Sequence, residues 1–221
     1  MDMKLFTYAK IYGNYTKGEI KALYADGKIL INNELLPLSC PIRDGDIVTI
    51  NNRVIENNIE FKYYKYYKPR GVLSVINDKP DSLINFIPRD IKLSPAGRLD
   101  KESEGLLILS NDGKFINELI NSDYSHEKEY IVEVKYPITN EFLEGIRGPH
   151  VIRGRATTPM RVERIDAFHL DLILYEGIYH QIRTIIKENN NVVLSLKRIR
   201  VRNYTLDDML PNEIREIKRT V

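Results

Sequence analysis

The residues Gly97-Arg98-Leu99-Asp100-Lys101-Glu102-Ser103-Glu104-Gly105-Leu106-Leu107-Ile108-Leu109-Ser110-Asn111-Asp112-Gly113 carry the strongest local pattern in this chain. A polar segment with a glycine for a tight turn comes first, and the apolar block Leu106–Leu109 follows it directly. That block is short enough for a buried strand, which the turn signal Asn111-Asp112-Gly113 would end. The pattern predicts that Asp100 lies on a loop backed by a buried strand, which would hold a reactive group rigidly.

Asp100 also has a simpler interpretation. A lone aspartate on a loop commonly caps a turn or pairs with a neighbouring cation, here Arg98 or Lys101. The local pattern leaves both interpretations open.

The whole stretch resembles the signature of the RNA pseudouridine synthases. That signature is Gly-Arg-Leu-Asp followed by a Glu-Gly-Leu-Leu-(apolar)-Leu-(Ser/Thr)-Asn-Asp-Gly run. The similarity extends over seventeen consecutive residues, Gly97 to Gly113. It is greatest to the RsuA-type branch, whose members modify ribosomal RNA and carry a small N-terminal RNA-binding domain. The resemblance implies that Asp100 is the catalytic nucleophile.

Two further segments resemble motifs of the same family. Lys128-Glu129-Tyr130-Ile131-Val132 is similar to the second motif, in which the tyrosine stacks on the target uracil. Gln181-Ile182-Arg183 is similar to the third, whose arginine pairs with the nucleophilic aspartate. Taken alone, Tyr130 would more often be a half-buried strand residue and Arg183 a solvated one. The chain departs from the branch at Tyr179-His180, where more arginine is usual. This departure bears on how the substrate is placed more than on the chemistry.

The implied reaction breaks the carbon–nitrogen glycosidic bond of uridine, rotates the uracil and rejoins it through carbon 5. Asp100 would attack either carbon 1′ of the ribose or the uracil ring, and the sequence does not decide between them. Arg183 would keep a sheltered carboxylate anionic, and Tyr130 would stack on the base and relay the carbon 5 proton. The base must leave its stack, which costs a few kcal/mol, and Arg98 would fill the vacated space.

Composition is consistent with this interpretation. The 221 residues are 43% hydrophobic and 29% charged, enough for one large domain or two unequal ones. No apolar run approaches the ~20 residues needed to cross a bilayer, and Met1–Lys10 has no signal-peptide pattern. Cys40 is the only cysteine, which favours the cytoplasm. The reaction involves no redox change, and the sequence has no Gly-rich phosphate loop. The four histidines, which lack metal-ligand spacing, are His126, His150, His169 and His180. We therefore expect no cofactor.

The net charge is only +2, from 33 basic and 31 acidic residues, so RNA binding must depend on where the charges lie. Two arginine groups stand out, one between residues 145 and 165 and one near the C-terminus, where alternation would put three arginines on one face of a strand. Either could be a solvated face, but together they favour phosphate contacts. The groups are Arg147, Arg153, Arg155, Arg161 and Arg164, and then Arg198, Arg200 and Arg202.

Residues 1–57 are expected to form a small domain. The pattern predicts a helix over Leu5–Ile11, a second helix capped by Thr16 with Glu19, and strands over 28–31 and 46–50. This order resembles the αL RNA-binding domain of ribosomal protein S-four, with Lys17 and Lys21 as RNA contacts. The usual basic pair is here Lys17-Gly18, and seven basic residues balance seven acidic ones in this domain. Its RNA affinity is therefore expected to be weak.

Residues 58–221 are expected to form the catalytic domain, after an Asn-rich linker around residues 51–58. The segment 61–71 interleaves aromatics with lysines and predicts either a strand burying Phe61, Tyr63 and Tyr67 or a base-stacking surface. Lys68-Pro69-Arg70-Gly71-Val72 resembles the opening of the family's catalytic domain, and we expect Lys68 and Arg70 to contact RNA.

The fold expected from the resemblance is α+β. It has a mixed, mostly antiparallel central sheet with flanking helices, the pseudouridine synthase fold, in addition to the small N-terminal domain. Further helices are predicted over 114–120 and from residue 181, and strands over 128–134, 170–174, 192–196 and 199–201. The expected partner is RNA, specifically ribosomal RNA, with no membrane and no obligate protein partner, and the chain is expected to be monomeric.

Two other functions compete with this one. The chain could be a non-catalytic RNA-binding or ribosome-assembly factor derived from the family. It could also be a nucleoside or sugar hydrolase, a class that uses two cooperating carboxylates, for which Glu102 and Glu104 are the nearest partners of Asp100.

Overall fold

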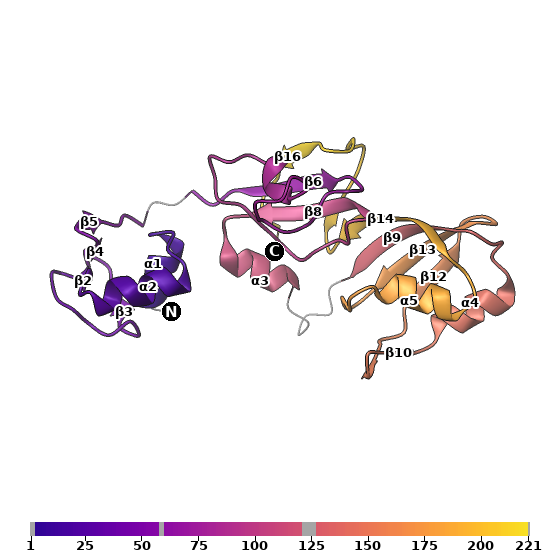
Figure 1. Ribbon diagram of the computed structural model, residues 1–221, viewed down its shortest axis with the longest axis horizontal. Helices are drawn as coiled ribbons and strands as arrows, with labels where there is room; N and C mark the ends of the chain where they lie inside the picture. Colours follow the sequence, from indigo (N-terminus) through magenta and orange to yellow (C-terminus); the bar gives the residue numbers. More distant parts are fainter. Residues whose placement is uncertain (1–2, 58–59, 121–126, 221) are drawn as a thin grey trace. The chain divides into compact units, whose positions relative to one another are not determined.

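The computed structural model describes residues 3–57, 60–120 and 127–220. The chain divides into two compact units, Met1–Phe61 and Lys62–Val221 (Figure 1). The division lies close to the boundary expected after residue 57, and Asn58 of the expected linker lies outside the described residues.

The first unit contains two helices, α1 (Leu5–Ile11) and α2 (Lys17–Ala25), as the sequence predicts. Thr16 accepts a hydrogen bond from the Glu19 amide at 3.3 Å, and Glu19 accepts one from the Thr16 amide at 2.6 Å. This confirms the predicted capping box. Two small antiparallel sheets complete the unit: β1 (Met3–Lys4) with β3 (Pro41–Ile42), and β2 (Ile29–Ile31) with β4 (Val48–Ile50) and β5 (Arg53–Val54).

A nine-stranded sheet forms the second unit, in the order β12-β13-β9-β14-β8-β6-β16, with β15 on β14 and β7 on β8. All pairs are antiparallel except β14 with β8, so the expectation of a mixed, mostly antiparallel sheet is confirmed. The strands are β6 (Tyr63–Lys68), β7 (Ser94–Pro95), β8 (Glu104–Ser110), β9 (Lys128–Val134), β12 (Arg161–Arg164), β13 (His169–Leu174), β14 (Val193–Val201), β15 (Tyr204–Thr205) and β16 (Ile214–Glu216).

Strands β6 and β8 are buried on both faces. Leu106–Leu109 in β8 are each at most 1% exposed, as the apolar block predicts. In β6, Tyr66 packs into one cluster and Tyr67 into the other, on the two sides of the sheet. The expectation that Phe61 would be buried in this strand is wrong, because the strand begins at Tyr63 and Phe61 is 36% exposed.

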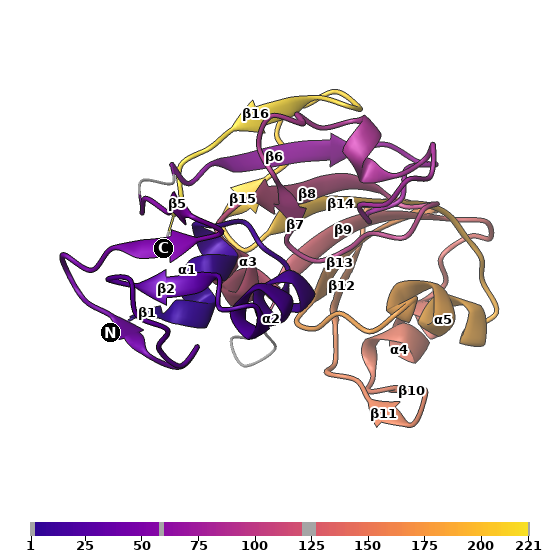
Figure 2. The same ribbon diagram turned by 60° about the vertical axis from the view of Figure 1, so that its left-hand side comes forward.

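Three helices cover the sheet (Figures 1 and 2). Helix α3 (Gly113–Ile120) packs Phe115 and Leu119 on β6 and β8. Helices α4 (Asn140–Arg147) and α5 (Gln181–Glu188) bury their apolar sides in a separate cluster with β9, β12, β13 and β14. A short 3-10 turn, η1 (Leu83–Asn85), and the hairpin β10 (Val151–Ile152) with β11 (Arg155–Ala156) complete this unit.

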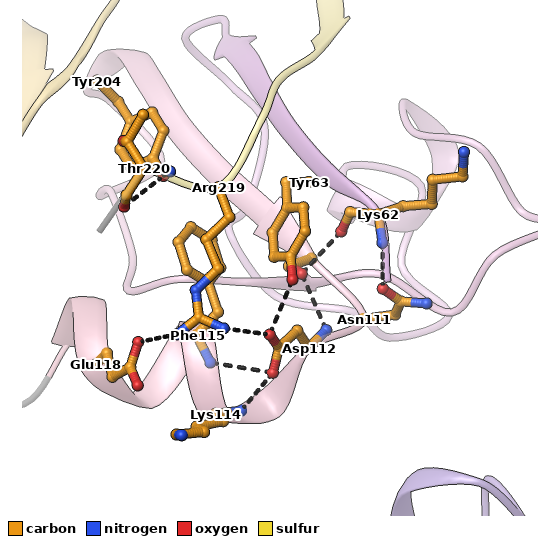
Figure 3. A network of polar contacts seen from close by, with 11 residues as sticks. Lys62, Tyr63, Asn111, Asp112, Lys114, Phe115, Glu118, Tyr204, Arg219 and Thr220 are labelled. Atoms are coloured by element: carbon orange, nitrogen blue, oxygen red, sulfur yellow. Dashed lines mark hydrogen bonds and ion pairs between the residues drawn. The ribbon is translucent and has the colours of Figure 1, made fainter. Parts of the chain in front are cut away.

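Asp112, from the predicted turn, links Arg219 near the C-terminus to β6 and α3 (Figure 3). Its carboxylate accepts hydrogen bonds from the amides of Lys114 and Phe115 at the start of α3, at 3.0 and 3.1 Å. It also accepts one from the Tyr63 hydroxyl at 3.0 Å and pairs with Arg219 at 3.4 Å. Burial and this hydrogen bond raise the pKa of Tyr63. One buried carboxylate thus joins β6, α3 and the C-terminal segment.

Within the described ranges, no helix has the length and apolar character needed to cross a membrane.

Candidate active site

A cleft of about 790 Å³ opens in the second unit between the loop 96–103 and the start of α5. Side chains from α3, β9 and β14 also line it, including Leu119, Tyr130 and Leu196. Leu119 belongs to the apolar cluster of α3, and Tyr130 and Leu196 belong to the cluster of α4 and α5. The cleft therefore lies between these two clusters.

The loop that carries Asp100 is held from both sides. Ser74, buried beneath it, donates to the Leu99 carbonyl at 2.8 Å and accepts from the Leu99 amide at 3.0 Å. The Gly71 amide donates to the Lys101 carbonyl at 2.8 Å. The backbone on each side of Asp100 is thus fixed by the turn 70–74, which gives the rigidity that a reactive group needs.

Two basic side chains face the Asp100 carboxylate, and both come from the start of α5. Arg183 Nε lies 3.8 Å from Oδ2, and His180 Nε2 lies 3.5 Å from Oδ1. Arg183 also donates to the Ser103 hydroxyl at 3.1 Å and to the Glu102 carbonyl at 3.4 Å. The Asp100 side chain is 27% exposed, so it is sheltered but can be reached from the cleft. The structure therefore brings Asp100 and Arg183 together.

Tyr130 lies in β9 and lines the same cleft. It is 8% exposed and belongs to the apolar cluster formed with α4 and α5. Lys128, two residues earlier on the same strand, also lines the cleft, and burial lowers its pKa to about 8. The three residues predicted to be catalytic, Asp100, Tyr130 and Arg183, thus share one cavity.

The expected RNA contact at Lys68 does not agree with the structure. Its side chain is 0% exposed, and its ammonium group donates to the carbonyls of Pro69 and Val72 at 2.9 and 2.8 Å. Burial lowers its pKa to about 8, and the charge of Asp100 partly opposes this. Lys68 therefore stabilises the turn that supports the Asp100 loop and has no surface for RNA.

The other expected RNA contacts of this unit are exposed. Arg98 and Arg155 line the cleft, and Arg153 lies with its guanidinium 4.6 Å from the ring centre of Tyr179. Tyr179 in turn stacks on His180 at 3.8 Å. Arg70 donates to the carbonyls of Glu102 and Leu194, so part of its guanidinium supports the loop. In the first unit, Lys17 and Lys21 are exposed one turn apart on α2.

The structure divides the first arginine group. Arg147 pairs with Glu144 at 2.9 Å and Arg161 with Glu163 at 2.5 Å, while Arg164 donates to the Ile138 carbonyl. Arg153 and Arg155 belong to the β10–β11 hairpin, which projects from the sheet in Figure 2. These two alone in the group lie at or beside the cleft among the contacts described.

The prediction that Arg198, Arg200 and Arg202 share one exposed face is wrong. A β-bulge between Arg198 and Arg200 pairs the first with Tyr130 and the second with Glu129, neighbours that project to opposite faces. Arg198 is 3% exposed and lines the cleft. Arg200 pairs with Glu127 and Glu129 at 2.9 and 2.5 Å. The predicted strands 192–196 and 199–201 are a single strand, β14.

Sequence reasoning did not assign Lys128, His180 and Arg198 to the site. Lys128 lies two residues from Tyr130 in the quoted motif, so strand alternation was a usable signal. His180 lies three residues before Arg183, at the spacing of one helical turn. Nothing in the local pattern could reveal the bulge that turns Arg198 inward.

The described residues contain no group of three or more His, Cys, Asp and Glu side chains that could hold a metal ion; His126 lies outside them.

The two carboxylates considered as partners of Asp100 in a hydrolase have different surroundings. Glu102 is exposed at the cleft, whereas Glu104 accepts a hydrogen bond from Tyr67 at 3.3 Å.

A mixed sheet whose central cleft gathers an aspartate, its arginine and a buried tyrosine is the arrangement implied for an RNA-modifying isomerase. Comparison with known proteins agrees. Residues 62–188 match the family model of RNA pseudouridylate synthase. The chain belongs to this family.

Individual relatives extend the similarity to nearly the whole chain. A dual-specificity RNA pseudouridine synthase RluF of Salmonella typhi is 30% identical over 217 residues, covering 97% of this chain and 75% of the relative. The ribosomal small subunit pseudouridine synthase A of Pseudomonas aeruginosa is 27% identical, covering 95% and 94%. A crystal structure of a pseudouridylate synthase matches with a TM-score of 0.71 and 25% identity over 98% of this chain and 96% of that one.

Proposed function

We propose that this protein isomerises a specific uridine of ribosomal RNA to pseudouridine, with Asp100 as the nucleophile. The observation that carries the proposal is the convergence of Asp100, Tyr130 and Arg183 on one cleft of an RNA pseudouridylate synthase fold. Ribosomal RNA is proposed because a relative of nearly equal length is named a ribosomal small subunit pseudouridine synthase.

The contacts around Asp100 support a division of roles. The Arg183 guanidinium, 3.8 Å from the Asp100 carboxylate, attracts that carboxylate and orients it for attack. The hydrogen bonds of Arg183 to Ser103 and to the Glu102 carbonyl fix that guanidinium relative to the loop. Tyr130, on the cleft wall, stacks on the uracil and relays its carbon 5 proton. The apolar surroundings retain the freed base until it is rejoined.

Access to the base requires the target nucleotide to leave its stack. Arg98 is exposed at the cleft and fills the space that the base vacates. Arg153 and Arg155, on the hairpin beside the cleft, bind phosphates of the flanking RNA, and Arg70 adds a contact from the supporting turn.

Residues 1–57 serve as an RNA-binding domain of the ribosomal protein S-four type, and residues 58–221 serve as the catalytic domain. The two helices and the following strands of the N-terminal domain, with Lys17 and Lys21 exposed on α2, support this assignment. Its balanced charge gives it a minor share of the RNA affinity. The protein acts as a monomer in the cytoplasm.

The decisive experiment incubates the full chain with in vitro transcripts of both ribosomal RNAs and maps pseudouridine by mass spectrometry. Pseudouridine at one defined position is expected, with no release of free uracil. Free uracil without pseudouridine would indicate a hydrolase. RNA binding with neither product would indicate a non-catalytic factor.

A further inference from the structure

Arg198 lies on the cleft wall beside the tyrosine proposed to stack on uracil. On β14 it stands directly opposite Tyr130 of β9, and residues opposite each other on neighbouring strands project to the same face. Both side chains line the cleft. On the other side of Arg198 stands Gly105 of β8, at φ +107°, where a Cβ would come within 2.2 Å of the Arg198 carbonyl oxygen. Glycine at this position lets the two strands approach closely.

The protein uses only part of the Arg198 guanidinium. Its Nε donates to the Leu106 carbonyl at 2.8 Å, which fixes the plane of the group. Its Nη2 is buried and has no hydrogen-bond partner among the residues that the structure describes. A buried charged donor without an acceptor is costly, and such groups are rare in folded proteins. A hydrogen-bond acceptor on a bound substrate would give this Nη2 group its missing partner.

Charged groups of both signs act near this position. Lys68 and Lys128 both have a pKa lowered to about 8, chiefly by burial, and in both the charge of Arg198 lowers it further. The carboxylates that act on them are Asp100, Glu102 and Glu104 for Lys68 and Glu176 for Lys128. A guanidinium is always charged and bonds most strongly to an acceptor that carries, or develops, negative charge.

We propose that Arg198 Nη2 donates a hydrogen bond to a carbonyl oxygen of the flipped uracil and stabilises the negative charge on that ring during the reaction. This inference rests on the proposed function. If Asp100 attacks carbon 1′, a new C–O bond forms and the electron pair of the C1′–N1 bond stays on the uracil, delocalised onto O2 and O4. If it attacks carbon 6, the pair of the C5–C6 double bond moves through carbon 4 onto O4. Both routes charge O4.

A fixed guanidinium in a sheltered cleft stabilises such a charge more strongly than solvent does, because it needs no reorganisation. The role is electrostatic, and the test must separate it from a structural role and from phosphate binding. Electron-withdrawing fluorine at carbon 5 of uracil stabilises the ring anion by itself, so the reaction of 5-fluorouridine should depend less on Arg198.

The experiment compares full-length wild type, Arg198→Met and Arg198→Lys, with Arg161→Met as an exposed control. Single-turnover rate constants are measured on ribosomal RNA transcripts containing uridine or 5-fluorouridine, following pseudouridine formation or loss of 5-fluorouridine. We expect Arg198→Met to react about 100-fold more slowly on uridine and less than about tenfold more slowly on 5-fluorouridine. RNA dissociation constants should change less than about threefold, since binding contributes little to this effect. Arg198→Lys should recover part of the rate.

Equal defects on the two substrates would show a structural role and overturn the inference. Weaker RNA binding with an unchanged rate constant would assign Arg198 to a phosphate and overturn it as well. If Arg198→Met does not fold, the comparison is made with Arg198→Lys, whose loss of rate should likewise be larger on uridine than on 5-fluorouridine. A wild-type protein that forms no pseudouridine would refute the proposed function itself, which the other outcomes leave intact.

Discussion

Arg183 Nε lies 3.8 Å from Asp100 Oδ2, and Arg183 belongs to the first turn of helix α5, which begins at Gln181, far along the chain from the loop that carries the aspartate. The same guanidinium contacts Ser103 and the Glu102 carbonyl, so it holds the loop as well as the carboxylate. Arg183 therefore both supplies a positive charge beside the Asp100 carboxylate and holds the loop that positions it.

Replacing Arg183 separates these two contributions. Arg183→Leu removes both and should lower the single-turnover rate constant by about 10³-fold, the scale of losing a strong electrostatic contact at a reacting group. Arg183→Lys restores a point charge but not the fork of donors, so it should react faster than the leucine variant and slower than wild type. Arg161→Leu, an exposed arginine paired with Glu163, serves as the control. Wild-type rates in Arg183→Leu would assign the role to His180, which lies 3.5 Å from Oδ1.

The hairpin arginines should determine much of the salt dependence of RNA binding. Each phosphate contact contributes roughly 0.7 to 0.9 to the slope of log affinity against log salt. Changing Arg153 and Arg155 together to Gln should therefore reduce the slope by about 1.5. Changing Arg161 and Arg164 to Gln is the matched control, because both lie in the same stretch but bind protein partners. A slope that falls equally in both pairs would refute a specific role for the hairpin.

The buried lysine below the loop predicts a pH dependence of stability. The pKa of Lys68 is lowered from 10.5 to about 8, chiefly by burial. Between pH 8 and 10 the unfolded chain therefore holds a proton that the folded chain releases, and the free energy of unfolding rises with pH. Lys128 acts in the same direction. In Lys68→Met the rise should be smaller.

Urea denaturation at a series of pH values measures this rise. Lys101→Met is the control, because the hydrogen bond that Lys101 donates to Asp81 raises the pKa of Lys101 and places its titration above this range. An identical rise in Lys68→Met and wild type would show that Lys68 does not titrate as its burial requires.

Removing residues 1–57 should leave the chemistry intact. The chain from Asn58 onward keeps the cleft and its lining residues. Because the removed domain carries no net charge, RNA affinity should fall only about tenfold, or ~1.4 kcal/mol. Single-turnover rates and dissociation constants of both proteins on one transcript test this. Insolubility of the shorter chain would contradict the proposed boundary, and complete loss of binding would contradict the minor role of the domain.

Local sequence patterns were enough to predict the elements that show a regular apolar pattern or a capping motif. The apolar block of β8, the alternation in β9 and the Thr16–Glu19 capping box all appear as expected. The resemblance placed Asp100, Tyr130 and Arg183 as candidates, and the structure puts them in one cleft.

The predictions that were wrong concern residues whose surroundings depend on segments distant in the sequence. Lys68 and Arg70 look alike in the motif, but Lys68 ends β6, which lies between β8 and β16, and is 0% exposed, whereas Arg70 lies beyond the strand and is exposed. The bulge in β14 arises from its pairing with β9, so alternation alone put Arg198 on the wrong face. Helix α4 was missed, although its amphipathic sequence packs three apolar residues into the core.

Asp100 is central to the account, and its replacement by asparagine is the most direct test. The measurement is tritium release from ribosomal RNA transcripts labelled at carbon 5 of uridine, under single-turnover conditions, for wild type and Asp100→Asn. The amide keeps the shape of the side chain but not its nucleophilicity, so RNA binding and folding should persist while the rate constant falls by more than about 10⁴-fold. Retention of more than a trace of tritium release by Asp100→Asn would contradict the assignment of Asp100 as the nucleophile.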